Sequence, residues 1–227
     1  GKSPTGGETV RRLVQDMGCR VLVATHRSEL IVQDVKAIRS VWVDAPIGVY
    51  SASLGRKEIG QITVAGVQSI AKQAKRLGHI DVMIVDEAHL IPATASENYG
   101  RLISSLRVVN PDMRLLGYTA TPFRLGQGYL TQGDGAVFTA IAYEVGIRRL
   151  IEAGFLAPVV TQSVRAKIDT SKVHTVAGEF NLRELGEVSD TDEINGAVAD
   201  DVADAMREGR TSAIVVAANL EHAARSR

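Results

Sequence analysis

The hydrophobic positions of this 227-residue chain form short β-branched runs that alternate with segments of helical periodicity. The apolar runs predict strands at 20–25, 47–50, 62–64, 81–85 and 114–118. Apolar side chains at helical spacing predict helices at 28–38, 67–77 and 96–108. Strands that alternate with helices are typical of an α/β fold, and the nearly continuous apolarity of 81–85 suits a parallel strand covered on both faces. We therefore expect a doubly wound parallel sheet with helices on both faces.

The pattern loosens after residue 122. The expected elements there are a glycine-rich loop at 126–135, a helix at 144–153, a strand at 159–164, a helix at 193–207, a strand at 211–217 and a helix from 220 onward. The last strand and helix are typical of the start of a second α/β unit. The expected organisation is a first domain over 1–125, a loop and connecting helix over 126–160, and a linker with an incomplete second domain over 161–227.

Composition excludes several classes of protein. The hydrophobic fraction of 45% and the charged fraction of 23% are ordinary for a globular chain and exclude a disordered one. The 26 basic residues equal the 26 acidic ones, but residues 179–208 hold ten acids against Arg183 and Arg207, so the remainder is basic and can present one positive groove. Cys19 is the single cysteine, which excludes an intramolecular disulfide. No apolar stretch has the length of a membrane span, and no signal peptide is evident, so we expect a soluble, cytoplasmic protein without a membrane partner.

A pair of carboxylates follows the buried run at 81–85, in the sequence Asp86-Glu87-Ala88-His89. Ligands of doubly wound sheets bind at the carboxyl ends of the strands. A carboxylate in this place can hold Mg²⁺ through water against nucleotide phosphates, and its neighbour can orient or deprotonate an attacking water. The plainer alternative is a solvated turn with Asp86 or Glu87 near a helix N-terminus.

Two threonines follow the run at 114–118 in the same way. Thr119 and Thr121 precede Pro122 on a tight turn. Their hydroxyls can hydrogen-bond to the preceding motif and across a domain cleft. By themselves they also fit an ordinary Thr-Pro turn.

A short glycine-rich stretch, Ser3-Pro4-Thr5-Gly6-Gly7, could bring backbone N–H groups close to a phosphate. A Walker loop continues with Gly-Lys-Ser/Thr, so that the lysine reaches the β- and γ-phosphates. Here Glu8 follows Gly7 directly, and Lys2 precedes the stretch. We therefore expect further residues between Gly7 and Glu8 in the natural polypeptide. The alternative is a true deletion that leaves Glu8 in place of the lysine and abolishes ATP binding.

Taken in order, these motifs resemble the core of superfamily 2 helicases and translocases of the DEAD/DEAH-box class. Thr5-Gly6-Gly7 resembles the start of motif I, Asp86-Glu87-Ala88-His89 reads as a DEAH box, and Thr119-Ala120-Thr121 resembles motif III. Residues 24–30 are similar to motif Ia, 63–70 to motif Ib, and 214–223, with Asn219 and His222, to motif IV. Residues 118–124, Tyr143-Glu144 and 150–158 resemble the RadD/YejH-type branch of DNA-repair helicase-like proteins.

The resemblance implies a RecA-like first domain, the start of a second one, and an ATP-dependent DNA helicase or translocase that uses ATP and Mg²⁺. It assigns nucleotide binding to Pro4, Thr5, Gly6 and Gly7. It assigns catalysis to Asp86, Glu87 and His89, with Asp86 holding Mg²⁺ through water, and coupling to Thr119 and Thr121. It assigns contacts with single-stranded or branched DNA to Arg27, Thr63, Gln68 and Ser69.

Two other functions stay open. The missing lysine favours a non-enzymatic, helicase-like platform that binds DNA or protein, whereas the intact Asp86 and Glu87 pair favours an enzyme. An RNA-directed ATPase of the same superfamily is the third alternative, because a DEAH box does not separate RNA from DNA. Motifs V and VI would follow residue 227, so we expect ATP hydrolysis to need a second domain.

Overall fold

The computed structural model describes residues 2–92, 98–124, 128–159, 165, 167–176 and 179–225. The chain divides into two compact units, Gly1–Ile141 and Ala142–Arg227. No helix in the described ranges is long and apolar enough to cross a membrane.

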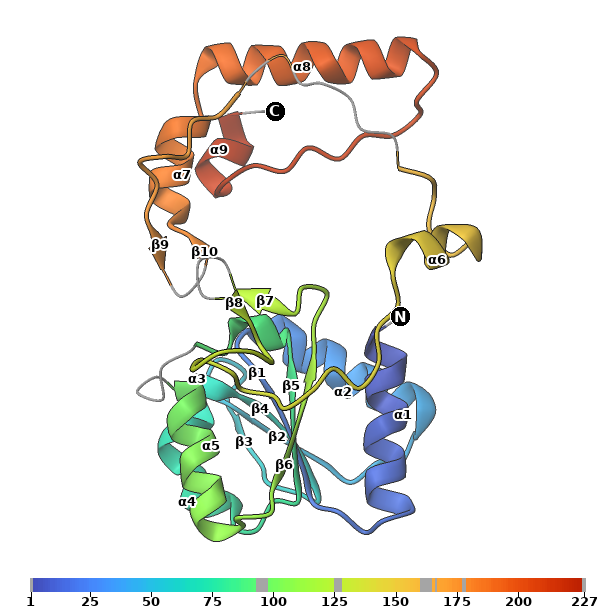
Figure 1. Ribbon diagram of the computed structural model, residues 1–227, viewed down its shortest axis with the longest axis vertical. Helices are drawn as coiled ribbons and strands as arrows, with labels where there is room; N and C mark the ends of the chain where they lie inside the picture. Colours follow the sequence, from blue (N-terminus) through green and yellow to red (C-terminus); the bar gives the residue numbers. More distant parts are fainter. Residues whose placement is uncertain are drawn as a thin grey trace. The chain divides into compact units, whose positions relative to one another are not determined.

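The first unit is built on a six-stranded sheet of order β3-β2-β4-β1-β5-β6 (Figure 1). Its strands are β1 (Val21–Thr25), β2 (Ile47–Ser51), β3 (Arg56–Lys57), β4 (Ile62–Gly66), β5 (Val82–Asp86) and β6 (Arg114–Tyr118). All neighbours pair in parallel except β3, which runs antiparallel to β2 at the edge. The predicted parallel α/β sheet is confirmed.

The register brings the ends of four strands to one edge of the sheet. Thr25 at the end of β1 lies opposite Gly66 of β4, and Asp86 at the end of β5 lies opposite Tyr118 of β6. β1 pairs with β4 on one side and with β5 on the other. We call this edge, where β1, β4, β5 and β6 end, the carboxyl edge.

Helices cover both faces of the sheet, as Figure 1 shows. One face carries α1 (Lys2–Gln15) and α2 (Ser28–Val41), and the other carries α3 (Val67–Ile70), η1 (Ala71–Gln73), α4 (Ala74–Leu77) and α5 (Asn98–Val109). Alternate side chains of one strand enter the two layers. In β1, Val21 and Val23 pack in the core beneath α1 and α2, and Leu22 and Ala24 pack in the core beneath α3 and α5.

The segment expected to form a phosphate loop is helical. α1 runs without interruption from Lys2 to Gln15, so residues 3–7 are helical where a loop is expected. The expectation of further residues between Gly7 and Glu8 in the natural polypeptide stays a prediction. The apolar side chains Val10 and Val14 are almost fully buried and anchor the helix. A Cβ on Gly7 would lie 2.6 Å from the carbonyl oxygen of Ala37 on α2. Gly7 therefore lets the two helices approach closely.

A short hairpin follows the sheet. β7 (Phe123–Arg124) pairs antiparallel with β8 (Gly128–Tyr129), where the sequence predicts only a loop. The buried Arg124 donates from Nε to the carbonyl oxygen of Ile91 at 2.6 Å and from one terminal nitrogen to that of Gly135 at 3.1 Å. Arg124 thus holds the hairpin against the segment that follows β5.

The second unit contains α6 (Ile147–Glu152), the hairpin β9 (Thr175–Val176) and β10 (Glu179–Phe180), α7 (Leu182–Ser189), α8 (Asp192–Arg207) and α9 (Leu220–Arg225). The strand expected at 211–217 does not form, and Ile214 and Val216 are 92% and 87% exposed. No described strand pairs with this segment, and an apolar run without a partner strand has no sheet to join. Most of the strand expected at 159–164 lies outside the described residues.

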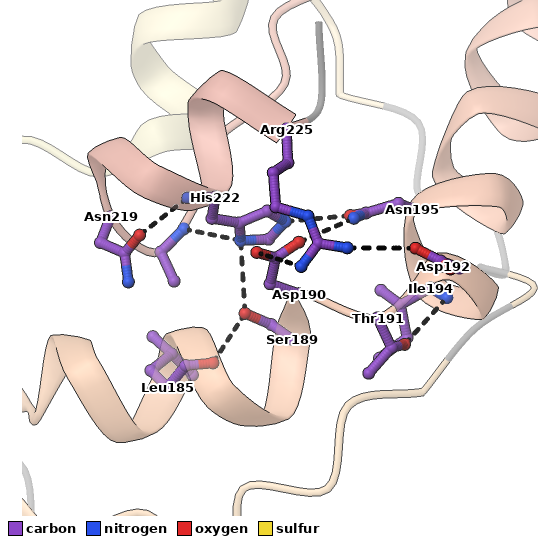
Figure 2. Close-up of polar contacts among 11 residues, drawn as sticks. Leu185, Ser189, Asp190, Thr191, Asp192, Ile194, Asn195, Asn219, His222 and Arg225 are labelled. Carbon is purple, nitrogen blue, oxygen red and sulfur yellow. Dashed lines mark hydrogen bonds and ion pairs between the residues drawn. The ribbon is translucent and has the colours of Figure 1, made fainter.

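A hydrogen-bonded cluster ties α9 to the junction of α7 and α8 (Figure 2). His222 accepts the Ala218 N–H at Nδ1, so its Nε2 carries the proton and donates to Asn195 Oδ1 at 3.0 Å. Ser189 Oγ lies 3.4 Å from His222 Nδ1 but donates its proton to the carbonyl oxygen of Leu185 at 2.7 Å. Because Ser189 is also buried, this arrangement is a packing element and has no accessible nucleophile.

Gly7→Ala should lower the free energy of unfolding by about 1–3 kcal/mol, because a new methyl group meets a backbone carbonyl that cannot move aside. Gly6→Ala is the matched control: its Cβ would lie 4.0 Å from the Tyr118 ring, and alanine is the better helix former, so stability should rise by about 0.5–1 kcal/mol. Urea denaturation of both variants measures the difference. Equal effects of the two substitutions would contradict the α1–α2 contact at Gly7.

Candidate functional site

The carboxylates of the site emerge from the end of β5 through a strained turn. Asp86 is the last residue of β5, and its Oδ1 accepts the Glu87 N–H at 3.0 Å. Glu87 has φ +50°, the one positive φ at a non-glycine residue in the described ranges. The turn leads directly into η2 (Ala88–Leu90), whose Ala88 is fully buried. A left-handed non-glycine residue costs about 1–3 kcal/mol, and such strain is typical of functional sites.

A hydrogen bond joins the ends of β5 and β6. His89 Nδ1 lies 2.9 Å from Thr119 Oγ1 and 3.4 Å from a carboxylate oxygen of Glu87. The Thr119 hydroxyl donates to the carbonyl oxygen of Thr121 at 3.0 Å and accepts the Thr121 N–H at 3.1 Å. Because that hydroxyl has only one proton, His89 Nδ1 must be the donor in its bond to Thr119. The residues predicted for catalysis and for coupling therefore contact each other directly.

A small cavity lies between α1, α2 and the carboxyl edge. Its volume is about 30 Å³, which is room for one or two water molecules. Its lining residues are Ser3, Gly6, Gly7, Val10, Val23, Asp34, Ala37, Ile38, Ile84, Asp86 and Tyr118. Gly6 and Gly7 of the motif I segment therefore line the same cavity as Asp86, although a helix presents them.

The site has two parts, Asp86 at the end of β5 and the motif I residues of α1, and they differ in how well they fit ATP and Mg²⁺. Asp86 can hold Mg²⁺ through water, since Mg²⁺ needs only one or two carboxylates. No described group of three or more histidine, cysteine or acidic residues could hold a metal ion by itself. On the other side, Pro4, Thr5, Gly6 and Gly7 form helical turns, and the cavity is far smaller than a nucleotide. The residues of motif I therefore do not fit a triphosphate.

Glu8 does not face Asp86. Its carboxylate is held on α1 itself by Arg11 at 2.8 Å and by Arg12 at 2.7 Å. These hydrogen bonds lower the pKa of Glu8 to about 2. Glu8 lines a separate, open hollow with Thr5, so the hypothesis that it takes the lysine's place against the phosphates is wrong.

Asp34 of α2 is a site residue that the sequence analysis missed. Its Oδ2 is buried and has no hydrogen-bond partner among the described residues, and Asp34 lines the same cavity as Asp86. Burial, and then the negative charge of Asp86, raise the pKa of Asp34 to about 7. The signal in the sequence is a carboxylate on the apolar stripe of a helix, between the buried side chains Ile31 and Ile38.

Tyr99 of α5 is a second missed residue. It is 4% exposed, and within the part of the chain that the structure describes its hydroxyl has no hydrogen-bond partner. Burial, together with the charges of Asp86 and Asp34, raises the pKa of Tyr99 above its usual range. An aromatic residue in a helical apolar pattern gives no hint in the sequence of this electrostatic environment.

The residues expected to contact nucleic acid divide into two groups. Arg27 and Gln68 are exposed just after β1 and β4, at the carboxyl edge. Ser69 is half-buried, and its Oγ accepts the Ala52 N–H at 3.0 Å. Thr63 is fully buried in the middle of the sheet, and its hydroxyl bonds to Gly60. The assignment of Thr63 to the interface is therefore wrong, because β4 is covered by helices on both faces.

Asp34→Asn should change how stability depends on pH. Between about pH 4 and pH 7 the folded state keeps the Asp34 proton and the unfolded state releases it, so stability falls as pH rises through this window and levels off above it. At pH 8 the substitution should therefore raise the free energy of unfolding by up to about 4 kcal/mol relative to its effect at pH 4. Urea denaturation at pH 4, 6 and 8 tests this, with Asp44→Asn at an exposed position as control. Parallel pH profiles for wild type and Asp34→Asn would refute the electrostatic environment assigned to Asp34.

The chain is similar to several known helicases and restriction enzymes. The chain is 24% identical over 185 residues to the putative ATP-dependent helicase IRC3 of Saccharomyces cerevisiae; the match covers 78% of this chain but only a quarter of the yeast protein. Among solved structures, the UvsW helicase of bacteriophage T4 has a TM-score of 0.44 and 20% identity, covering 54% of this chain and 44% of UvsW. The Type ISP restriction-modification enzyme LlaGI, solved with a DNA substrate mimic, has a TM-score of 0.44 and 12% identity, covering 95% of this chain and 22% of LlaGI.

A match to a family model shows which protein family the chain belongs to. The model of the type III restriction enzyme res subunit matches residues 1–124, more than half of the chain. This match and the yeast relative support a superfamily 2 helicase core. The matched range contains the whole six-stranded sheet and the residues of the carboxyl edge. The chain belongs to the family of the type III restriction enzyme res subunit.

Proposed function

We propose that this chain is the DNA-binding module of a helicase or translocase that acts in DNA repair or processing. The observation that supports this proposal is the order of the strands at the carboxyl edge. β1, which precedes Arg27, lies between β4, which precedes Gln68 and Ser69, and β5, which ends at Asp86. Polar side chains suited to a phosphate backbone thus lie beside the network of His89 and Thr119.

The exposed side chains at β1 and β4 suit contacts with a phosphate backbone. Arg27 offers a planar guanidinium that can donate two parallel hydrogen bonds to phosphate oxygens. Ser69 accepts the Ala52 N–H, which leaves its own proton available for donation. Because phosphate contacts carry no base information, this module should have little sequence preference.

We propose DNA as the nucleic acid because of a sequence resemblance at the start of the second unit. Tyr143-Glu144 and residues 150–158 resemble the RadD/YejH-type branch of DNA-repair proteins, and α6 (Ile147–Glu152) includes the first residues of the second segment. RNA is the alternative that a binding experiment must exclude.

An ATP-dependent DEAH-box helicase or translocase is the second candidate function. The hydrogen bond between His89 and Thr119, and the emergence of Asp86 and Glu87 at the carboxyl edge, favour it. This chain spans about a quarter of the length of the yeast relative, so such an activity would belong to a larger assembly. The helical motif I argues against it for this chain.

ATP turnover separates the two candidates. We expect this chain to show the same background rate with single-stranded DNA, with RNA and with neither, because motif I does not fit a triphosphate. Glu87→Gln provides the baseline, since it removes the carboxylate assigned to the attacking water. Turnover that single-stranded DNA stimulates and Glu87→Gln abolishes would establish the second candidate; stimulation by RNA alone would establish the RNA-directed ATPase.

Arg27→Ala should weaken DNA binding by a similar factor for every sequence and reduce the slope of log K against log salt concentration by about 1, because one phosphate contact is lost. Arg114→Ala is the matched control, since Arg114 is also exposed but begins β6 at the opposite edge of the sheet. Fluorescence anisotropy with labelled single-stranded DNA at several salt concentrations measures both. Equal losses for the two variants would refute an interface at the carboxyl edge.

A further inference from the structure

We propose that this chain does not bind ATP, and that its binding of DNA is therefore independent of nucleotide. α1 occupies the position expected for the phosphate loop, and the small cavity beside it is lined by the side chains of Asp34 and Asp86. The first part of the proposal stands on α1, α2 and β5 alone. The second part rests on the proposed DNA binding.

The backbone of the motif I segment is not available to an anion. A glycine-rich phosphate loop works because several N–H groups point at the ligand and have no other partner. Gly6 and Gly7 lie inside α1, where the N–H groups take part in the hydrogen bonds of the helix itself. A phosphate would have to compete with the helix for these donors.

Tertiary contacts hold α1 in its helical form. Gly7 packs against the backbone of α2 so closely that no side chain fits between them. The Tyr118 hydroxyl donates to Thr9 Oγ1 at 2.8 Å and links α1 to the end of β6. Val10 and Val14 are 2% and 5% exposed in the core beneath the helix. Unwinding the first turns of α1 to form a loop would break these contacts.

The remaining cavity has the wrong size and the wrong charge. Its volume of about 30 Å³ compares with roughly 300 Å³ or more for a small-molecule site. Its charged lining residues are Asp34 and Asp86, and no lysine or arginine within residues 3–92 and 98–124 lines it. An entering phosphate would face the Asp86 carboxylate, and above about pH 7 the Asp34 carboxylate as well, and the approach of like charges is unfavourable.

Direct titration tests the proposal without reference to turnover. We would titrate the chain with the fluorescent analogue mant-ATP in the presence of Mg²⁺ and follow thermal unfolding with unlabelled ATP and ADP. We expect no saturable signal up to about 1 mM nucleotide and no shift of Tm, because a ligand that binds the native state raises Tm. Saturable binding that Asp86→Asn removes would show that nucleotide enters this cavity and would overturn the proposal.

The effect on DNA is measured separately. The affinity for labelled single-stranded DNA should change by less than about twofold when ATP or ADP with Mg²⁺ is added at that same concentration of about 1 mM. A tenfold change in either direction would overturn nucleotide-independent binding. Absence of DNA binding under every condition would refute the proposed function, whereas the mant-ATP titration would still decide whether the chain binds nucleotide.

Discussion

The parallel pairing of β5 between β1 and β6 is the constraint on which the site depends. In this register β1, β4, β5 and β6 all end at the carboxyl edge, so Asp86 lies beside Tyr118 and close to the segment after Thr25. A slip by one residue would exchange the two faces of β5. Packing on both faces of β5 opposes such a slip, because Met83 and Val85 are buried in one core and Val82 and Ile84 are buried in the other.

That constraint also explains which parts of the fold could be predicted from the sequence. Apolar runs and helical periodicity in the sequence reflect which side chains are buried. Each parallel strand of a doubly wound sheet is buried on both faces, so the bounds of the parallel strands from β1 to β6 were predicted to within about two residues. The prediction of a strand at 211–217 was wrong because the sequence pattern indicates apolarity but not the presence of a partner strand. The prediction of a loop at residues 3–7, which lie in α1, was wrong for a different reason. A glycine pair permits close approach of some backbone, and the sequence does not say whether a phosphate or the Ala37 carbonyl occupies that space.

The residues of the site divide in the same way. The positions of Asp86, Glu87 and Thr119 were predictable because Asp86 ends β5, and Glu87 and Thr119 directly follow β5 and β6. Thr63 was misplaced because it belongs to a motif that begins inside a central strand, where side chains face the core. Asp34 was missed because its environment depends on a contact between α2 and the end of β5, 52 positions away in the sequence. Local patterns cannot report a charge that becomes important only through such packing.

The turn after β5 keeps its geometry for reasons that do not involve α1. The strained Glu87 is held by the bond from the Leu90 N–H to its carbonyl oxygen at 2.9 Å and by the burial of Ala88. On the other side, a Cβ on Gly117 of β6 would lie 2.7 Å from the Ala88 Cβ and 2.5 Å from the Phe138 ring, so the turn is packed tightly against its neighbours. The network of His89 and Thr119 forms on this rigid base. The motif II half of the site can therefore stay intact in a chain whose motif I half has become part of a helix–helix contact.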